Sequence, residues 1–174
     1  APDLAQIDFE SMSGPLMARV EHDRFVLDFP SRPPEATDNI DSLAAVIGER
    51  PERTLEAAGM HMAVMDNERS VVGLEPDLDR LIGIDCLGLI VTAPGHEADF
   101  VSRFFAPSVG VAEDPVTGSA HCLLVPYWSG ILQKDDLVAY QLSRRGGVLY
   151  CRNRGDRVEI GGGAVHYLEG TITV

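Results

Sequence analysis

The chain lacks any paired-cysteine pattern. Its three cysteines, Cys86, Cys122 and Cys151, stand far apart, and no Cys-x-x-Cys spacing occurs. Structural zinc sites and redox-active dithiols need that spacing, and an odd number of distant thiols does not fit a disulfide framework. We therefore expect no metal site, and we expect a reducing compartment, the cytoplasm.

Basic charge is also scarce. The 174 residues include 14 Lys and Arg against 27 Asp and Glu, which gives a formal net charge of −13. A field of this sign repels nucleic-acid phosphates and anionic membrane surfaces. No apolar run reaches the length of a membrane-spanning helix, and the N-terminus has no basic-then-apolar signal pattern. We expect neither nucleic acid nor a membrane as a partner.

Apolar residues in the chain recur with two spacings, one typical of strands and one typical of helices. Alternating apolar positions between Gly, Pro and Asn punctuation predict strands, and helical spacing predicts short helices over 38–48 and 76–82. The predicted strands cover 7–11, 16–29, 55–66, 71–74, 86–92, 100–105, 137–143, 147–153, 157–161 and 164–174, with a loop over 106–117. The fold class is therefore predicted to be α+β.

The most apolar helix is predicted over residues 118–132. Apolar side chains such as Leu123 and Trp128 cover much of its circumference. A helix that is apolar nearly all round belongs inside a structure. Together with the many short strands that follow it, this predicts an antiparallel β-barrel or curved sheet wrapped around a central buried helix.

The segment whose residues are suited to binding or catalysis is EDPVTGSA, residues 113–120, which leads into that helix. A helix N-terminus presents unpaired N–H groups and the positive end of the helix dipole, so it attracts anions. Gly118 would let a ligand approach the backbone closely, and Ser119 adds a hydroxyl group. A carboxyl group beside a bound anion retains its proton more readily, so Asp114 is a candidate proton donor.

Simpler alternatives for this turn stay open. Asp114 or Thr117 could only cap the helix, which is the commoner role of such residues. Two catalytic motifs are excluded on detail. A phosphate-binding loop needs Gly-Lys-Ser/Thr, but Ala120 follows Ser119, and a nucleophile elbow would need glycine where Thr117 and His121 stand.

Several motifs together carry a family resemblance. The central one is FAP followed by GVAEDPVTGSAH, over residues 105–121. It continues with PYW, QLSRRGG and VEIGGG and is preceded by FES, GPL and LDFP; these stretches cover residues 126–128, 141–147, 158–163, 9–16 and 27–30. The chain resembles the PhzF-like (phenazine biosynthesis-like) isomerases over most of its length.

This resemblance implies a diaminopimelate-epimerase-like fold with two similar lobes, each a β-barrel around a helix. A small carboxylate-bearing metabolite would bind between the lobes and be isomerised by proton shuttling, without metal or organic cofactor. Asp114 matches the family's acidic residue in the C-terminal lobe and is the expected catalytic residue. The expected substrate-binding residues are Glu113, Thr117, Gly118, Ser119 and Ala120.

The resemblance also implies an incomplete chain. Residues 1–15 match the end of an N-terminal lobe, and residues 16–174 match the C-terminal lobe. The family's main base, a Glu of the N-terminal lobe, has no counterpart here. We therefore expect the isolated chain to be inactive, and we expect its partner to be a second copy in a homodimer or the missing lobe.

Two other functions remain as alternatives. One is a non-catalytic binding or oligomerisation module derived from the fold. The other is a cysteine-type epimerase or racemase, which Asp114 disfavours because it stands where those enzymes place a thiol. Around the site, we expect His121 to pack with one hydrogen bond and Cys122 to be a small buried side chain. Arg103, Arg144 and Arg145 could attract an acidic substrate or form ion pairs.

Overall fold

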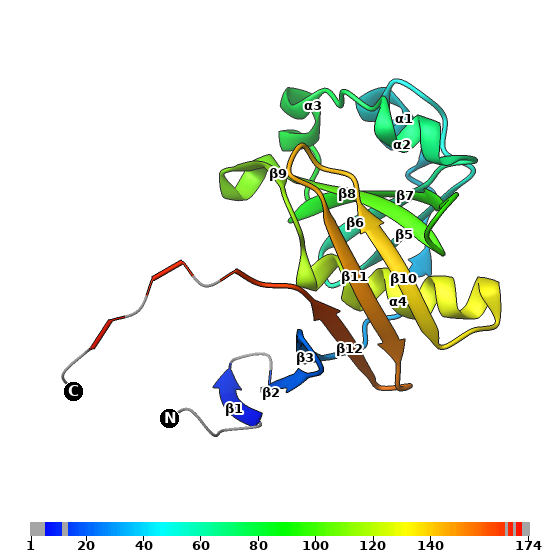
Figure 1. Ribbon diagram of the computed structural model, residues 1–174. Helices are drawn as coiled ribbons and strands as arrows, with labels where there is room; N and C mark the ends of the chain where they lie inside the picture. The colour runs from blue at the N-terminus through cyan, green and yellow to red at the C-terminus, as the bar shows by residue number, and fades with distance from the viewer. Residues whose placement is uncertain (1–5, 12–13, 166, 169, 172–174) are drawn as a thin grey trace.

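The computed structural model describes residues 6–11, 14–165, 167–168 and 170–171 (Figure 1). The strands are β1 Gln6–Ser11, β2 Gly14–Glu21, β3 Arg24–Pro30, β4 Glu35–Ala36, β5 Arg53–Ala57, β6 Met60–Val64, β7 Gly88–Pro94, β8 Phe100–Ala106, β9 Val111–Asp114, β10 Asp136–Gln141, β11 Gly147–Asn153 and β12 Arg157–Gly162. The helices are α1 Ile40–Ile47, α2 Glu68–Val72, α3 Leu78–Ile82, the 3-10 turn η1 Pro107–Val109 and α4 Gly118–Leu132. None of the described helices is long and apolar enough to span a membrane.

All these strands join one curved sheet. Its order is β1-β2-β3-β12-β11-β10-β8-β7-β6-β5-β4, and β9 pairs with β8. The order ends on β1 and β4, so the sheet curves without closing. Most neighbours are antiparallel, but β10 pairs with β8, and β6 with β7, in parallel. The expected α+β fold with a curved sheet is confirmed, whereas the expectation that the sheet is antiparallel throughout is wrong.

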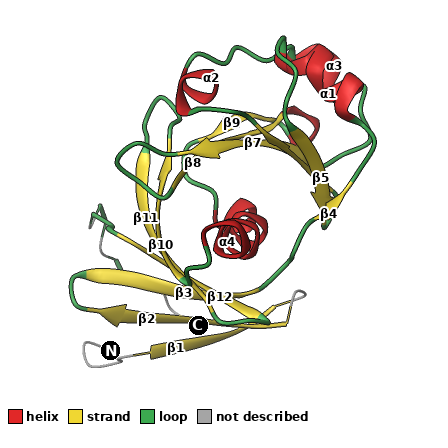
Figure 2. Ribbon diagram, turned by 90° about the vertical axis from the view of Figure 1, so that its right-hand side faces the viewer, coloured by secondary structure: helices red, strands yellow, loops and turns green. Residues whose placement is uncertain are grey.

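Helix α4 lies inside the curve of the sheet, as the view along its axis shows (Figure 2). Its side chains Leu123, Leu124, Val125 and Trp128 are at most 2 % exposed and belong to the core that fills this space. The Trp128 indole N–H donates to Thr92 Oγ1 at 3.0 Å, so the one polar atom of that ring is satisfied. The helix is thereby fixed from several sides.

A second core covers the outer face of the sheet. Leu89, Val91 and Ala93 of β7 point into it, and helices α1, α2 and α3 close it from outside (Figure 2). The intervening Ile90 points towards α4. The continuous apolar run expected over 86–92 is therefore a strand that is covered on both faces.

Four local expectations are wrong. The single strand expected over 55–66 is a hairpin of the antiparallel strands β5 and β6. Residues 71–74 are not a strand, because the Asn67 side chain accepts a hydrogen bond from Ser70 N and starts helix α2. The loop expected over 106–117 contains η1 and β9. No strand forms over 164–165, 167–168 and 170–171, and the rest of the strand expected over 164–174 lies outside the described residues.

The first strands extend the sheet beyond the part that surrounds α4. Strand β3 pairs with β12 in antiparallel register, and β2 and β1 follow it outward. Apolar side chains such as Ile7 and Phe9 on β1 are 46 % and 49 % exposed. The assignment of residues 1–15 to the end of another lobe stays a prediction.

Candidate active site

Helix α4 begins without a side-chain cap. Thr117 is the N-cap residue with extended backbone dihedrals, but its hydroxyl group makes no capping hydrogen bond, and the first turn contains no acidic residue. The N–H groups of Gly118, Ser119 and Ala120 come before the first intrahelical hydrogen bond and have no partner within the helix. The positive end of a 15-residue helix is thus left open to an anionic group.

The Thr117 side chain instead belongs to a network with Asp114 and Gln141. Thr117 Oγ1 lies 2.5 Å from Asp114 Oδ2. The Gln141 amide donates to Asp114 O at 2.7 Å and to Thr117 Oγ1 at 3.0 Å, and it accepts from Thr117 N at 2.8 Å. Gln141 is 1 % exposed and Thr117 is 4 % exposed, whereas Asp114 is half-buried. One buried amide therefore anchors the turn that carries the candidate acid.

A second pair of contacts fixes the same turn. The Ser143 hydroxyl donates to Pro115 O at 2.8 Å and accepts from Gly146 N at 3.0 Å. A Cβ atom added at Gly147 would come within 2.5 Å of Val116 Cγ2, so the two turns touch where only glycine fits. The segment after β10 therefore acts as a support for the turn before α4.

His121 lies in the first turn of α4 and is fully buried. Its Nδ1 is 2.6 Å from Thr117 O, and a carbonyl group can only accept, so Nδ1 holds the proton. Burial lowers the pKa of His121 to about 4, although the hydrogen bond to Thr117 opposes this shift. The expectation that His121 packs with one hydrogen bond is confirmed, and the residue is neutral near pH 7.

The open end of α4 faces a cavity of about 1000 Å³. Gly118, Val116, Phe29 and Arg145 are among its lining residues. A Cβ atom at Gly118 would meet only the Phe29 ring, at 3.6 Å, which is ordinary van der Waals contact. Protein packing therefore does not require glycine at this position, and the missing side chain leaves room in the cavity.

The other expected site residues lie differently. Ser119 is exposed and lines a neighbouring cavity of about 480 Å³. Ala120 as a whole residue is 1 % exposed and packs in the core. Glu113 accepts from the Arg103 guanidinium at 2.7 and 3.1 Å, and Arg103 also donates to two backbone carbonyls. For Arg103 the ion-pair alternative is confirmed.

The thiols are poorly suited to proton chemistry. Burial raises the pKa of Cys122 to about 11 and that of Cys151 to about 12. Cys122 is 6 % exposed and packs in the inner core, as expected for a small buried side chain. Within the part of the chain that the structure describes, no cluster of three or more His, Cys, Asp or Glu side chains is arranged to hold a metal ion.

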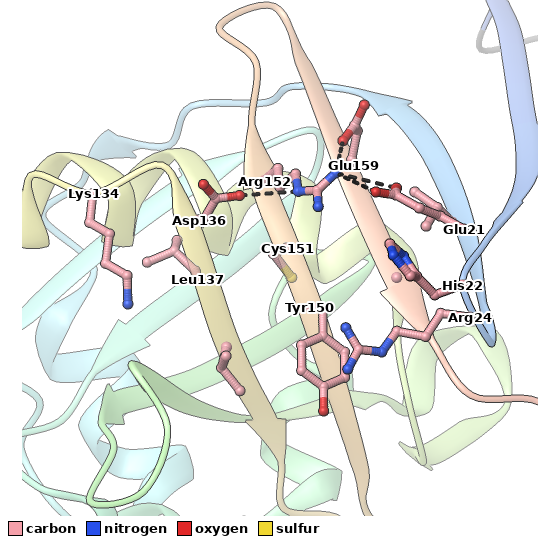
Figure 3. A pocket seen from close by; sticks show the side chains of 13 residues that line it. Glu21, His22, Arg24, Lys134, Asp136, Leu137, Tyr150, Cys151, Arg152 and Glu159 are labelled. Atoms are coloured by element: carbon pink, nitrogen blue, oxygen red, sulfur yellow. Dashed lines mark hydrogen bonds and ion pairs between the residues drawn. The ribbon is translucent and has the colours of Figure 1, made fainter.

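Another cavity, of about 380 Å³, lies beside the sheet at β2, β10, β11 and β12 (Figure 3). Arg152 occupies its upper part and pairs with Glu21 at 3.1 Å, Asp136 at 3.1 Å and Glu159 at 3.6 Å. Hydrogen bonds from Arg152 lower the pKa of Glu21, and in return Glu21 raises the pKa of Arg152. These ion pairs tie four strands together, β2, β10, β11 and β12.

Gln141 and Ser143 were missed as site residues. Both belong to the QLSRRGG stretch, but their side chains act on a turn more than 20 residues earlier in the chain. The one local signal is a polar residue at an inward position of β10, after the buried Leu137 and Ala139. Buried polar side chains are hydrogen-bonded, so a partner had to exist, but the pattern did not identify it.

Comparisons with known proteins agree with this geometry. A model of the PhzC/PhzF family, described as phenazine biosynthesis-like protein, matches residues 10–170. A protein of Pseudomonas aeruginosa named uncharacterized isomerase PA3578 is 44 % identical over 167 residues, which cover 96 % of this chain and 64 % of that protein. The mouse phenazine biosynthesis-like domain-containing protein 2 is 43 % identical over 187 residues, covering 96 % of this chain and 65 % of the relative.

Solved structures show the same likeness. The crystal structure of a PhzF-family protein from Enterococcus faecalis superposes with a TM-score of 0.87 at 38 % identity, covering 92 % of this chain and 62 % of that one. The chain thus spans less than two thirds of the length of these relatives. The resemblance that its motifs carry is confirmed, and the chain belongs to the PhzC/PhzF family of phenazine biosynthesis-like proteins.

Proposed function

We propose that this chain supplies one catalytic lobe of an isomerase that moves a proton within a small carboxylate-bearing metabolite. Asp114 is the proton carrier, and the backbone N–H groups of Gly118, Ser119 and Ala120 hold the substrate's carboxylate. The observation that supports this most is the uncapped start of α4 beside Asp114, with Gly118 lining a cavity of about 1000 Å³. The isomerase names of relatives such as PA3578 support the reaction class.

The chemistry follows from the charge that develops in such a reaction. Removing a proton from carbon next to a carboxyl or carbonyl group places negative charge on oxygen. Unpaired N–H groups at a helix N-terminus stabilise that charge without having to reorganise. A half-buried carboxyl group at the same turn can return the proton to a different carbon. Both steps use side chains and backbone alone, so we propose a reaction without metal or organic cofactor.

Charge around the cavity supports an anionic substrate. Arg144 and Arg145 are exposed and pair with no acidic group that the structure describes, although acidic residues outnumber basic ones 27 to 14. Arg145 lines the same cavity as Gly118. An unneutralised guanidinium group attracts carboxylates over several ångströms and raises their local concentration.

The proposed assembly has two lobes of the diaminopimelate-epimerase-like kind, each with a barrel around a central helix. In this proposal residues 1–15 complete an N-terminal lobe that supplies a Glu base, residues 16–174 form the second lobe, and the protein acts as a cytoplasmic homodimer. The isolated chain is then inactive, because it lacks the Glu base that removes the proton and the other half of the cleft.

Deuterium wash-in tests the function. Candidate carboxylic acids are incubated in D₂O with the chain and, separately, with the full product of its gene, and NMR records exchange at carbon. We expect exchange with the full product and none with Asp114→Asn. If Asp114→Asn exchanges at the unmodified rate and thiol alkylation abolishes exchange, the cysteine-type alternative is correct. Binding of carboxylates without exchange in either protein would favour the non-catalytic module.

A further inference from the structure

The buried amide of Gln141 has only one possible orientation. Thr117 N can only donate, so the Gln141 atom that lies 2.8 Å from it must be the amide oxygen, Oε1. Asp114 O can only accept, so the Gln141 atom that lies 2.7 Å from it must be the amide nitrogen, Nε2. The second proton on Nε2 then points to Thr117 Oγ1 at 3.0 Å. Backbone groups therefore settle the amide orientation without any choice about hydrogen positions.

The next hydrogen bond joins the Thr117 hydroxyl group to the Asp114 carboxylate, and its direction follows from the same donor and acceptor rules. A threonine hydroxyl group has one proton, and Thr117 Oγ1 already accepts from Gln141. An ionised carboxylate can only accept, so the hydroxyl group donates this proton to Asp114 Oδ2, 2.5 Å away. Oδ1 of Asp114 forms no hydrogen bond with any residue that the structure describes. The two oxygens of this carboxyl group are thus chemically distinct.

From this chain of donors we infer that Gln141 and Thr117 are positioning residues that hold Asp114 by Oδ2 and leave Oδ1 to exchange the proton. The inference rests on the proposed function, because it assigns roles to the atoms of the same acid. Neither residue touches the substrate in this account. They act through Asp114, and the Gln141 amide transmits the rigidity of β10 to the turn.

The same hydrogen bond keeps the acid away from the helix. Asp114 lies three residues before the N-cap, and a free carboxylate near a helix N-terminus turns to accept its N–H groups. Such a turn would occupy the N–H groups at the start of α4, of which those of Gly118 and Ser119 belong to residues that are not buried. The Thr117 hydroxyl thereby keeps the proton carrier and the anion site separate.

The first test uses the unmodified, isotopically labelled chain without ligand. We expect the Thr117 hydroxyl proton to give its own NMR resonance, protected from water exchange, with a nuclear Overhauser contact to Asp114 Hβ. The Asp114 χ1 angle, from three-bond couplings, should show one rotamer. A hydroxyl proton in rapid exchange with water, together with averaged Asp114 couplings, would overturn the inference.

Variants at Thr117 separate positioning from general support. Thr117→Val removes the hydroxyl group but keeps the shape, and it loses no helix cap because the side chain makes no capping hydrogen bond. We expect averaged Asp114 couplings and at least a fivefold weaker acetate affinity, measured by titration. Thr117→Ser keeps the hydroxyl group and should retain both properties. The double variant Asp114→Ala/Thr117→Val should recover acetate affinity, since no carboxylate remains to compete.

The outcomes distinguish this inference from the proposed function. If the unmodified chain does not bind acetate at Gly118, Ser119 and Ala120, the proposed function fails, while the ligand-free Asp114 couplings still test the positioning role. If acetate binds but Thr117→Val matches the unmodified chain in couplings and affinity, the positioning role is wrong. Should Thr117→Val fail to fold, the hydroxyl resonance of the unmodified chain still decides.

Discussion

Two polar clusters of this molecule use opposite kinds of hydrogen bonding. The cluster around Arg152 is held by ion pairs, because its guanidinium group pairs with the carboxylates of Glu21, Asp136 and Glu159. The turn before α4 is held by the neutral side chains of Gln141 and Ser143. Because the supporting groups there are neutral, the charge of Asp114 and the N–H groups of α4 stay available. The comparison shows that a turn can be held in place by neutral side chains, without an ion pair to its carboxyl group.

The largest expected effect comes from removing the neutral support. Gln141→Leu leaves Thr117 N and Asp114 O without partners in a buried place. We expect the free energy of unfolding to fall by about 4 kcal/mol, as is typical when buried backbone groups are orphaned along with several lost hydrogen bonds. Urea denaturation measures it, with the exposed Gln6→Leu as control. Equal effects of the two substitutions would contradict a role for Gln141 in the turn.

Acid should also lower the stability of the fold, through the buried His121 in the first turn of α4. The pKa of His121 is about 4 in the folded chain and about 6.5 when unfolded, so between these values only the unfolded chain takes up the proton. Stability is therefore present above pH 6.5 and lost as the pH falls towards 4, by about 3 kcal/mol from this group.

The non-titrating His121→Gln variant isolates that contribution. Urea denaturation of both proteins across this pH range should show a steeper loss for the unmodified chain, because carboxylates contribute equally to both. Parallel curves would mean that His121 is not the neutral, buried group that the structure shows.

Breaking the charged cluster should matter less. Arg152→Met removes three ion pairs, but its side chain is 39 % exposed and solvent screens the charges. We expect a loss within about 1 kcal/mol that shrinks further in 1 M salt. The effect of Gln141→Leu should not depend on salt. The same salt dependence at both clusters would remove the distinction between them.

The smallest stability effect is expected at Gly118. Gly118→Ala meets only the Phe29 ring, so the free energy of unfolding should change by less than about 0.5 kcal/mol. Acetate affinity should nevertheless fall about tenfold, a difference of about 1.4 kcal/mol in binding, because the new methyl group enters the cavity. Unchanged affinity would show that ligands do not approach this backbone.

The sequence predicted local features of the site better than its supports. Helix α4 was expected over 118–132 and spans those residues, because an apolar run follows the extended Thr117 and ends before polar residues. The turn with Asp114, Thr117 and Gly118 was also expected before this helix, and its role in catalysis stays a prediction. Gln141 and Ser143 were missed because their partners lie in a turn more than 20 residues away in the chain, and hydrogen bonds over such separations leave no periodicity in the sequence.

Errors in the fold have similar causes. Short elements such as α2 and β9 depend on one or two contacts. These are the Asn67 cap for α2 and the pairing with Phe104 and Ala106 for β9, and they override weak propensities. The parallel pairing of β10 with β8 joins strands separated by α4, which adjacent hydrophobic patterns cannot reveal. The sequence also left open whether Arg103 attracts a substrate or forms an ion pair, because its partner Glu113 lies on another strand.

The central claim is that the start of α4 is an open anion site beside Asp114. An acetate titration of the ¹⁵N-labelled chain, followed by backbone amide resonances, tests it directly. Helix α1 is an internal control, because it also lacks a side-chain cap but has Asp41 in its first turn. We predict saturable shifts at Gly118, Ser119 and Ala120 and none at Ile40 and Asp41. Equal shifts at both helices, or none at α4, would contradict the account.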